Sequence, residues 1–428
     1  MTSRDPSLAP GRDVQRTIDA VWRIESAKLI AALARMVRDV GQAEELAQDA
    51  LVAALERWPV DGIPDNPGAW LMATAKRRAI DRMRHGQMAR LKHEEIAREL
   101  EAVQEEAVAS QHANLDDHIG DDMLRLVFTA CHPVLSMEAR VALTLRLLGG
   151  LTTDEIARAF LVPEPTIAQR IVRAKRTLAE KQVPFEVPLR QELPERLASV
   201  LGVVYLIFNE GYSATAGSEW TRAGLCSEAT RLGRVLVGLA PAEPEVHGLV
   251  ALMELQASRL HARTTADGTP ILLMDQNRAR WDRLLIQRGL NALRQAERLG
   301  GTNGAYALQA AIAACHARAN SAEATDWARI AALYDTLATV LPNPVVELNR
   351  AVAHAMAFGP EAGLALADAL VDEKSMREYH LLPSVRGDFL FKLGRNAEAR
   401  AEFERAASLA RNEREKKLLE DRAAACDA

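Results

Sequence analysis

The spacing of apolar residues over 43–58 (AEELAQDALVAALERW) is that of an amphipathic α-helix. From Ala43 to Trp58, small or apolar residues recur every three or four positions, which gives one continuous face for packing. The opposite stripe carries Glu45, Asp49, Val52 and Glu56. Three prolines and two glycines follow within 59–68, so this segment is predicted to be a loop. A second helix is predicted over 69–84.

A further helical unit is predicted over 121–182. The pair Gly149–Gly150 is expected to end one helix of this unit. Thr152, with Glu155 three residues later, forms a capping box that begins the next helix. Between the two helical units, residues 86–120 are acidic and weakly periodic, and they are predicted to form a flexible or loosely helical linker.

The remaining residues, 183–428, show helical patterning with prolines and glycines at the breaks. Ala399, Phe403 and Ala406 recur at spacings of four and three, which is how one tetratricopeptide helix packs on its partner. A second such unit is predicted over 344–370. The chain is therefore expected to be all-α, with parts at 14–85, 86–120, 121–182 and 183–428.

Composition supports this expectation, because hydrophobic residues make up 48% of the chain and aromatic residues only 4%. No run of about 18 apolar residues is present, so no membrane span is predicted, and a membrane is not among the expected partners. The N-terminus lacks the apolar core of a secretory signal. The four cysteines are far apart in the sequence, which predicts neither a disulfide framework nor a metal site and favours a cytoplasmic protein. No cofactor is predicted.

The net charge of −5 conceals two basic clusters, at 76–84 (KRRAIDRMR) and 170–176 (RIVRAKR). The second lies on the later of two helices, predicted at 153–161 and 166–180, that a short turn joins. In a helix-turn-helix, the second helix enters the major groove of DNA. Here it presents four candidates for base contacts, Thr166, Gln169, Arg170 and Arg173, and two for phosphate contacts, Lys175 and Arg176. The alternative is an ordinary αα-hairpin with a solvated basic face.

The loop 59–68 and the helix after it form a second candidate site. Asn66 and Trp70 lie beside basic residues, an arrangement that can hold an unstacked base and its backbone. The alternative is a surface loop before a charged helix. The basic candidates are Lys76, Arg77, Arg78 and Arg82.

Taken in order, these segments resemble the extracytoplasmic-function (ECF) sigma factors over about residues 15–182. Residues 43–58 resemble the helix of that family that binds core RNA polymerase, with Gln48 and Asp49 at its most characteristic positions. Residues 68–84 resemble the helix that engages the −10 promoter element and its melted strand. Residues 151–178 resemble the helix-turn-helix that reads the −35 element. The polymerase-binding residues implied by the resemblance are Glu45, Gln48, Asp49 and Val52.

One departure from the family pattern is the presence of Pro163 and Pro165 in the turn, although proline is compatible with a first helical turn. The region after residue 182 resembles the extension of one subgroup, in segments 206–214 (LIFNEGYSA), 251–263 (ALMELQASRLHAR) and 308–317 (LQAAIAACHA). The resemblance implies that this extension regulates sigma activity in place of a membrane anti-sigma factor. An unknown ligand or protein is a candidate partner of the extension.

Other readings stay open at the level of sequence. Residues 209–212 (Asn-Glu-Gly-Tyr) mark either a ligand pocket at a helix end or a capped turn. Cys131 and His132 fit a helix terminus better than a metal site. The sequence shows no pairing of a nucleophile with a base, so the chain is not predicted to be an enzyme. The acidic linker is predicted either to shield the basic clusters in the free protein or to run near the basic RNA-exit path of the polymerase. The shielding alternative rests on Glu94, Glu95, Glu99, Glu101, Glu105 and Glu106. The rival functions are a one-component helix-turn-helix regulator with a helical sensor domain, and a tetratricopeptide scaffold.

Overall fold

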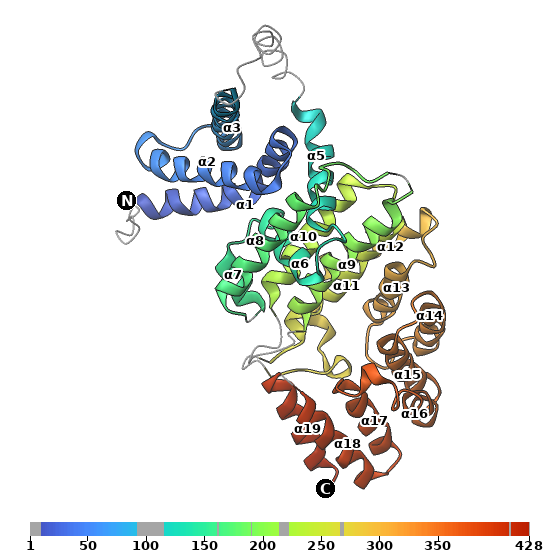
Figure 1. Ribbon diagram of the computed structural model, residues 1–428. Helices are drawn as coiled ribbons and strands as arrows, with labels where there is room; N and C mark the ends of the chain where they lie inside the picture. The colour runs from blue at the N-terminus through green and yellow to red at the C-terminus, as the bar shows by residue number, and fades with distance from the viewer. Residues whose placement is uncertain are drawn as a thin grey trace, which may run out of the picture. The chain divides into compact units, whose positions relative to one another are not determined.

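The computed structural model describes residues 10–91, 115–160, 162–189, 191–213, 222–265, 269–410 and 412–427. In these ranges the chain is helical and contains no β-strand, apart from one isolated bridge between Thr264 and Pro270. Figure 1 shows the helices in chain order. The all-α prediction is confirmed. The chain divides into two compact units, residues 1–203 and 204–428.

The first unit contains two groups of helices. α1, α2 and α3 pack on one another, and α5 to α8 form the second group. Contacts of α1 with α5 and of α2 with α8 join the groups. The bounds are α1 Pro10–Val37, α2 Val40–Asp61, α3 Pro67–Leu91, α5 Leu115–Ala130, α6 Met137–Leu147, α7 Thr153–Phe160, α8 Glu164–Glu180 and α9 Leu193–Tyr212, whose first half belongs to this unit.

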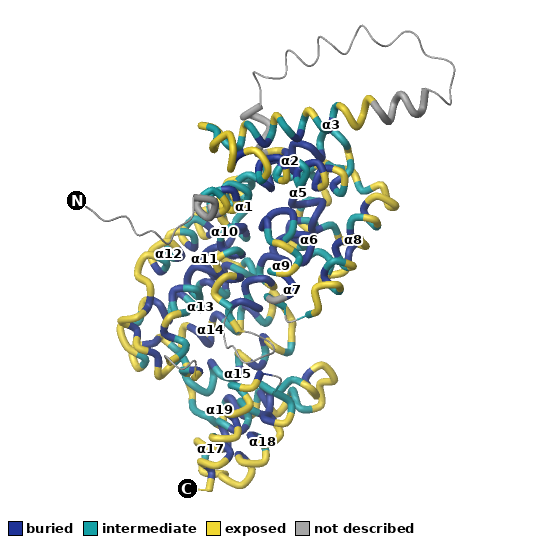
Figure 2. Tube along the Cα trace, turned by 90° about the vertical axis from the view of Figure 1, so that its left-hand side faces the viewer, coloured by how far each residue is buried: buried dark blue, intermediate teal, exposed yellow. Residues whose placement is uncertain are grey.

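The apolar face predicted for residues 43–58 is the buried face of α2, as the dark segments of that helix in Figure 2 show. Its fully buried members are Ala43, Leu46, Ala47, Ala50, Ala54 and Trp58. One charged residue is buried with them, because Glu44 is only 3% exposed. Its partners belong to the other group of helices and are described below.

The loop after α2 is shorter than the sequence predicted. Pro59 lies inside α2, and Gly62, with φ at +87°, ends that helix. A proline inside a helix removes one hydrogen bond and crowds the carbonyl four residues earlier, but α2 ends two residues after Pro59, so only its last turn is affected. At the other end of the loop, Pro67 is the first residue of α3, where its missing N–H has no partner to lose. The prediction that the whole of 59–68 is loop is therefore wrong.

Local signals fix the predicted helix-turn-helix, although α8 begins at Glu164, two residues before the predicted start at Thr166. Gly150 adopts φ +65° after α6, and the N–H of Gly149 bonds the carbonyl of Thr144. The capping box at α7 forms: the N–H of Thr152 donates to the Glu155 carboxylate at 2.8 Å, and the N–H of Glu155 donates to the Thr152 hydroxyl at 3.1 Å. Pro165 lies in the first turn of α8.

The helices on both sides of the predicted linker are longer than expected. α3 runs to Leu91 and α5 begins at Leu115, so both extend into the segment 86–120. The acidic residues proposed to shield the basic clusters, at positions 94 to 106, lie outside the described residues.

The first unit continues to Val203, beyond the predicted boundary after Gln182. The start of α9 is attached to the end of α5 by side chains. Arg196 donates to the carbonyl of Phe128 at 2.9 Å, and the Ser199 hydroxyl donates to the carbonyl of Cys131 at 2.8 Å. These bonds also give partners to carbonyl groups at the end of α5, as expected for a helix terminus at Cys131–His132.

The second unit is a succession of helices in which neighbours in sequence pack on each other. Four short 3₁₀ turns lie among its described residues, at Leu260–Ala262, Leu273–Asp275, Arg278–Arg280 and Lys374–Met376. The α-helices after α9 are α10 Ala223–Leu239, α11 Pro244–Ala257, α12 Arg283–Arg298, α13 Ala305–Arg318, α14 Trp327–Val340, α15 Pro344–Phe358, α16 Pro360–Asp368, α17 Leu381–Lys392, α18 Asn396–Leu409 and α19 Glu413–Ala425.

The tetratricopeptide-like packing predicted near the C-terminus is present. Ala399, Phe403 and Ala406 on α18 are all buried, and Phe403 is only 1% exposed. A Cβ added at Gly387 of α17 would lie 2.9 Å from the Phe403 ring, so glycine allows these two helices to approach. Helices α15 and α16, in the other predicted unit, contribute buried residues to the same core, among them Leu348 and Leu364.

Within the described ranges, no helix combines the length and apolarity needed to cross a bilayer. Over the same ranges, no three histidine, cysteine, aspartate or glutamate side chains lie together in a group able to hold a metal ion.

Candidate nucleic-acid interface

The stripe on α2 predicted to bind polymerase is an exposed surface. Val52 is 49% exposed, and the Glu45 and Asp49 side chains are about as accessible. Gln48 is half-buried and donates to the Glu44 carboxylate at 2.6 Å. An exposed valine between carboxylates leaves an apolar contact point on a charged surface.

The basic residues of α3 lie against this stripe. Arg82 pairs with Glu45 at 3.1 Å, and Arg78 pairs with Asp49 at 3.7 Å. The structure thus brings together residues that the sequence assigned to two different partners. All four side chains are well exposed, and such pairs contribute about 0–1 kcal/mol each, so a partner can separate them at little cost.

The remaining −10 candidates differ in accessibility. Asn66 caps α3, since its side-chain oxygen accepts the N–H of Ala69 at 3.0 Å. Trp70 is half-buried, and its ring packs edge-on against Trp58 at 5.4 Å between centroids. Arg77 is exposed, whereas Lys76 is half-buried. Burial, and secondly the charge of Arg35, lower the pKa of the Lys76 ammonium.

Helix α8 separates a core face from a solvent face. Gln169, Arg173 and Arg176 are exposed, while Thr166 and Arg170 lie half-buried at the edge of that face. Arg176 pairs with Glu180 at 2.6 Å. The residues that attach α8 to the fold are Ile167, Ile171, Ala174 and Leu178. Five of the six predicted −35 candidates are thus at least partly accessible on one side of a fixed helix.

Lys175, the sixth candidate, is directed elsewhere. Its ammonium forms an ion pair with the buried carboxylate of Glu44 on α2. Arg146 of α6 donates to the same carboxylate at 2.7 Å. Sequence reasoning missed Glu44, because the sequence does not distinguish it from its exposed neighbour Glu45. Its partners lie more than a hundred residues away, and no local pattern identifies them.

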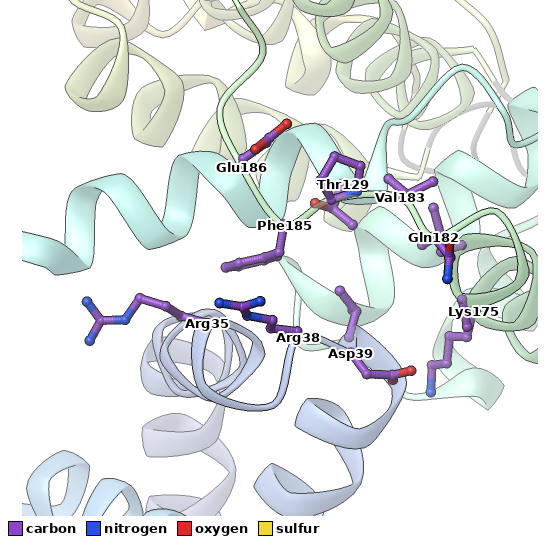
Figure 3. A pocket seen from close by; sticks show the side chains of 13 residues that line it. Arg35, Arg38, Asp39, Thr129, Lys175, Gln182, Val183, Phe185 and Glu186 are labelled. Atoms are coloured by element: carbon purple, nitrogen blue, oxygen red, sulfur yellow. The ribbon is translucent and has the colours of Figure 1, made fainter. Parts of the chain in front are cut away.

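Further contacts join the two groups of helices in the first unit. Arg23 of α1 pairs with Glu155 of α7 at 2.7 Å, and Arg35 pairs with Asp122 of α5 at 3.3 Å. Arg35 also lines a polar groove of about 770 Å³. Figure 3 shows Phe185, from the segment after α8, pointing toward Arg38 across this groove. The helix that presents the −35 candidates is therefore packed against the domain that presents the −10 candidates.

Three known families match segments of the chain between residues 24 and 297. Residues 24–88 match the family described as Sigma-70 region 2, and residues 125–178 match Sigma-70, region 4. The first match contains α2 and most of α3, and the second contains the helix-turn-helix α7–α8. Residues 196–297 match a family of unknown function, DUF6596.

Individual proteins are similar to this chain over different shares of its length. An uncharacterized protein of Rhizobium meliloti is 44% identical over 385 residues, which are 90% of this chain and 89% of that protein. A probable ECF RNA polymerase sigma factor, SigI of Mycobacterium tuberculosis, is 29% identical over 40% of this chain and 57% of its own length. The ECF RNA polymerase sigma factor SigK of Mycobacterium ulcerans is 29% identical over 35% of this chain and 78% of its own length.

The two sigma-70 regions occur in the order and at the positions predicted from the sequence. The sigma-factor relatives align to part of the chain. A long series of helices follows the second sigma-70 region. The chain belongs to the ECF sigma factors, in the subgroup that carries a long, tetratricopeptide-like C-terminal extension.

Proposed function

We propose that this sigma factor binds core RNA polymerase through the exposed stripe of α2 and recognises promoters through α3 and α8, with its activity modulated by the helical extension. The observation that carries the proposal is the accessible surface on α2 and α8. The Glu45–Asp49–Val52 stripe and the Gln169–Arg173 face are both exposed on helices whose opposite faces form the core. The polymerase performs the chemistry, and this chain supplies binding energy and specificity.

Recognition of the −35 element follows from side-chain geometry. Arginine donates two hydrogen bonds to guanine, and glutamine pairs with adenine in the major groove. At the −10 element, Trp70 and the loop at Asn66 are suited to hold an unstacked base, while Arg77 and its basic neighbours hold the phosphates. Capture of that base offsets the few kcal/mol that unpairing costs.

The packing of α8 against α2 implies a rearrangement during initiation. Lys175 can contact a DNA phosphate only after its ion pair with Glu44 opens. Likewise, the pairs of Glu45 with Arg82 and Asp49 with Arg78 must separate before polymerase and DNA use these side chains. We infer that the Glu44 ion pairs hold the free protein closed and that binding of polymerase opens it.

Removing the α2 stripe is expected to abolish stable association with core polymerase. The double substitution Asp49→Ala with Val52→Ala deletes a charge and an apolar contact near the centre of the surface. The few hot-spot residues of an interface lie at such central positions, and truncating one costs about 2 kcal/mol or more, roughly 30-fold in affinity. Co-elution with core polymerase in gel filtration measures the effect. Arg57→Ala, on an exposed position of the same helix, is the control. Equal co-elution of both variants would contradict the assignment.

Two substitutions on α8 are expected to affect DNA binding differently, because one removes a base contact and the other removes a phosphate contact. Arg173→Ala should reduce discrimination at one base pair by about 1–3 kcal/mol. Arg176→Ala should weaken binding to all sequences alike and lower the salt slope by about 1. Competition binding of polymerase holoenzyme to promoter variants, over a salt series, measures both. A uniform loss for Arg173→Ala would argue against direct reading by this residue.

A further inference from the structure

Three segments that sequence analysis singled out meet in the second unit. The end of α9 carries Tyr212, the region after α11 carries Arg259 and Arg263, and α13 carries His316. Arg278, from a 3₁₀ turn, donates to the carbonyl of His316 at 2.5 Å and connects the last of these segments to the cluster. These segments lie outside the Sigma-70 region matches, and the sigma-factor function described above does not use them.

Arginines and aromatic rings alternate through this cluster. The Arg263 guanidinium lies 3.8 Å from the centroid of the Tyr212 ring, and that of Arg259 lies 5.8 Å from the same ring. Arg259 also lies 5.8 Å from the Trp281 ring, and Arg278 lies 4.8 Å from it. We call this series, Arg263–Tyr212–Arg259–Trp281–Arg278, the arginine ladder. Cation–π contacts stabilise each neighbouring pair but do not cancel the repulsion among three positive charges.

The Arg259–Trp281–Arg278 end of the ladder is half-buried or buried and has little counter-charge. Arg278 is 8% exposed, and all its hydrogen-bond acceptors are neutral: the carbonyls of His316 and Ala319 and the hydroxyl of Thr325. Burial, followed by the charge of Arg259, lowers the pKa of the Arg278 guanidinium, and the charge of Glu323 opposes this shift only in part. Among the described residues, neither Arg259 nor Arg278 forms an ion pair with a carboxylate. The nearby carboxylate of Glu210 is engaged by Arg222.

Buried donors without protein acceptors lie at the same place. Within the described part of the chain, the Nε of Arg278 and the indole N–H of Trp281 are buried and bond no protein atom. Nδ1 of His316 is also buried and bonds no protein atom. Burial lowers the pKa of the His316 ring to about 3, so His316 is neutral at neutral pH. A buried donor without an acceptor is unfavourable, so two such donors beside Arg278, which forms no ion pair with a described carboxylate, favour an anionic acceptor.

We propose that the Arg259–Trp281–Arg278 end of the ladder binds the carboxylate or phosphate group of a small molecule. Arg259 supplies a half-buried guanidinium, which suits a bidentate contact with an anion, and Arg278 and Trp281 supply the unsatisfied N–H donors. Such a ligand would connect the DUF6596 part of the extension to small-molecule signals. The proposal is independent of the polymerase and promoter contacts, because every residue in it belongs to the second unit.

Thermal unfolding of the full-length protein tests the site, with inorganic phosphate and citrate as probes and sodium chloride at equal ionic strength as the reference. Phosphate, citrate or both should raise the melting temperature of one transition saturably, by roughly 5 °C at a hundred times the dissociation constant. The two probes distinguish a phosphate group from a carboxylate. No rise beyond that in sodium chloride would overturn the proposal.

Two variants locate the effect. Arg259→Gln should abolish the anion-dependent rise and, because it removes like-charge repulsion, should leave the anion-free protein at least as stable. Arg288→Gln, which removes the same charge from an exposed position of α12, should retain the full rise. If the ladder is only structural, Arg259→Gln will lower the melting temperature and anions will act equally on both variants. That outcome, or a rise that persists in Arg259→Gln, would also refute the proposal.

Discussion

Glu44→Gln is expected to destabilise the first unit by about 3 kcal/mol. The substitution leaves Arg146 and Lys175, each about four-fifths buried, without the carboxylate that neutralises them. Breaking a buried ion pair from one side typically costs 3–5 kcal/mol, and partial solvent access places this case at the lower end. Differential scanning calorimetry should show one transition lowered by roughly 6–12 °C.

The neighbouring residue provides a matched control. Glu45→Gln removes the same charge from the same turn of α2, but its partner Arg82 is half exposed, so the expected loss is under about 1 kcal/mol. Equal shifts for Glu44→Gln and Glu45→Gln would show that the Glu44 ion pairs do not hold α2 and α8 together. In that case the inferred closed form of the free protein would also lose its support.

Phe403→Ala is expected to be the most destabilising single change in the second unit. Phe403 is buried between α17 and α18, with the Arg422 guanidinium 4.7 Å from its ring centroid. Truncating a buried phenylalanine costs about 3–5 kcal/mol, because transfer energy is lost and a cavity remains. Urea unfolding followed by far-ultraviolet circular dichroism should show one transition at a lower midpoint.

Phe391→Ala is the control for that experiment, because Phe391 lies on α17 but is 41% exposed. Its expected cost is below about 1 kcal/mol. A similar midpoint for both variants would mean that the tetratricopeptide-like packing of α17 on α18 contributes little to the stability of the extension.

Features that depend on near neighbours in sequence were predictable. The buried face of α2 follows from helical periodicity, and the Thr152–Glu155 capping box needs only two residues three positions apart. The tetratricopeptide-like contact of Phe403 was predictable for the same reason. The loop after α2 was misjudged, because proline was treated as an absolute end of a helix, whereas α2 continues beyond Pro59 to Asp61.

Features that depend on distant partners were not predictable. Lys175 is placed by a carboxylate on another helix, and its sequence neighbours indicate only a basic helix. The arginine ladder draws on Tyr212, Arg259 and Arg278, which come from separate segments of the second unit. The alternative of a ligand pocket near Tyr212 could be raised from the sequence, but the arginines and Trp281 that would form it could not.

Run-off transcription with purified bacterial core polymerase tests the central claim most directly. Templates are genomic fragments that include the region upstream of the protein's own gene, and the comparison is between the full-length chain and its Asp49→Ala, Val52→Ala variant. We predict specific transcripts that appear only when the full-length protein is added and that the variant does not support. No transcripts from the full-length protein, together with no binding to core polymerase, would contradict sigma activity and favour a one-component regulator that binds duplex DNA alone.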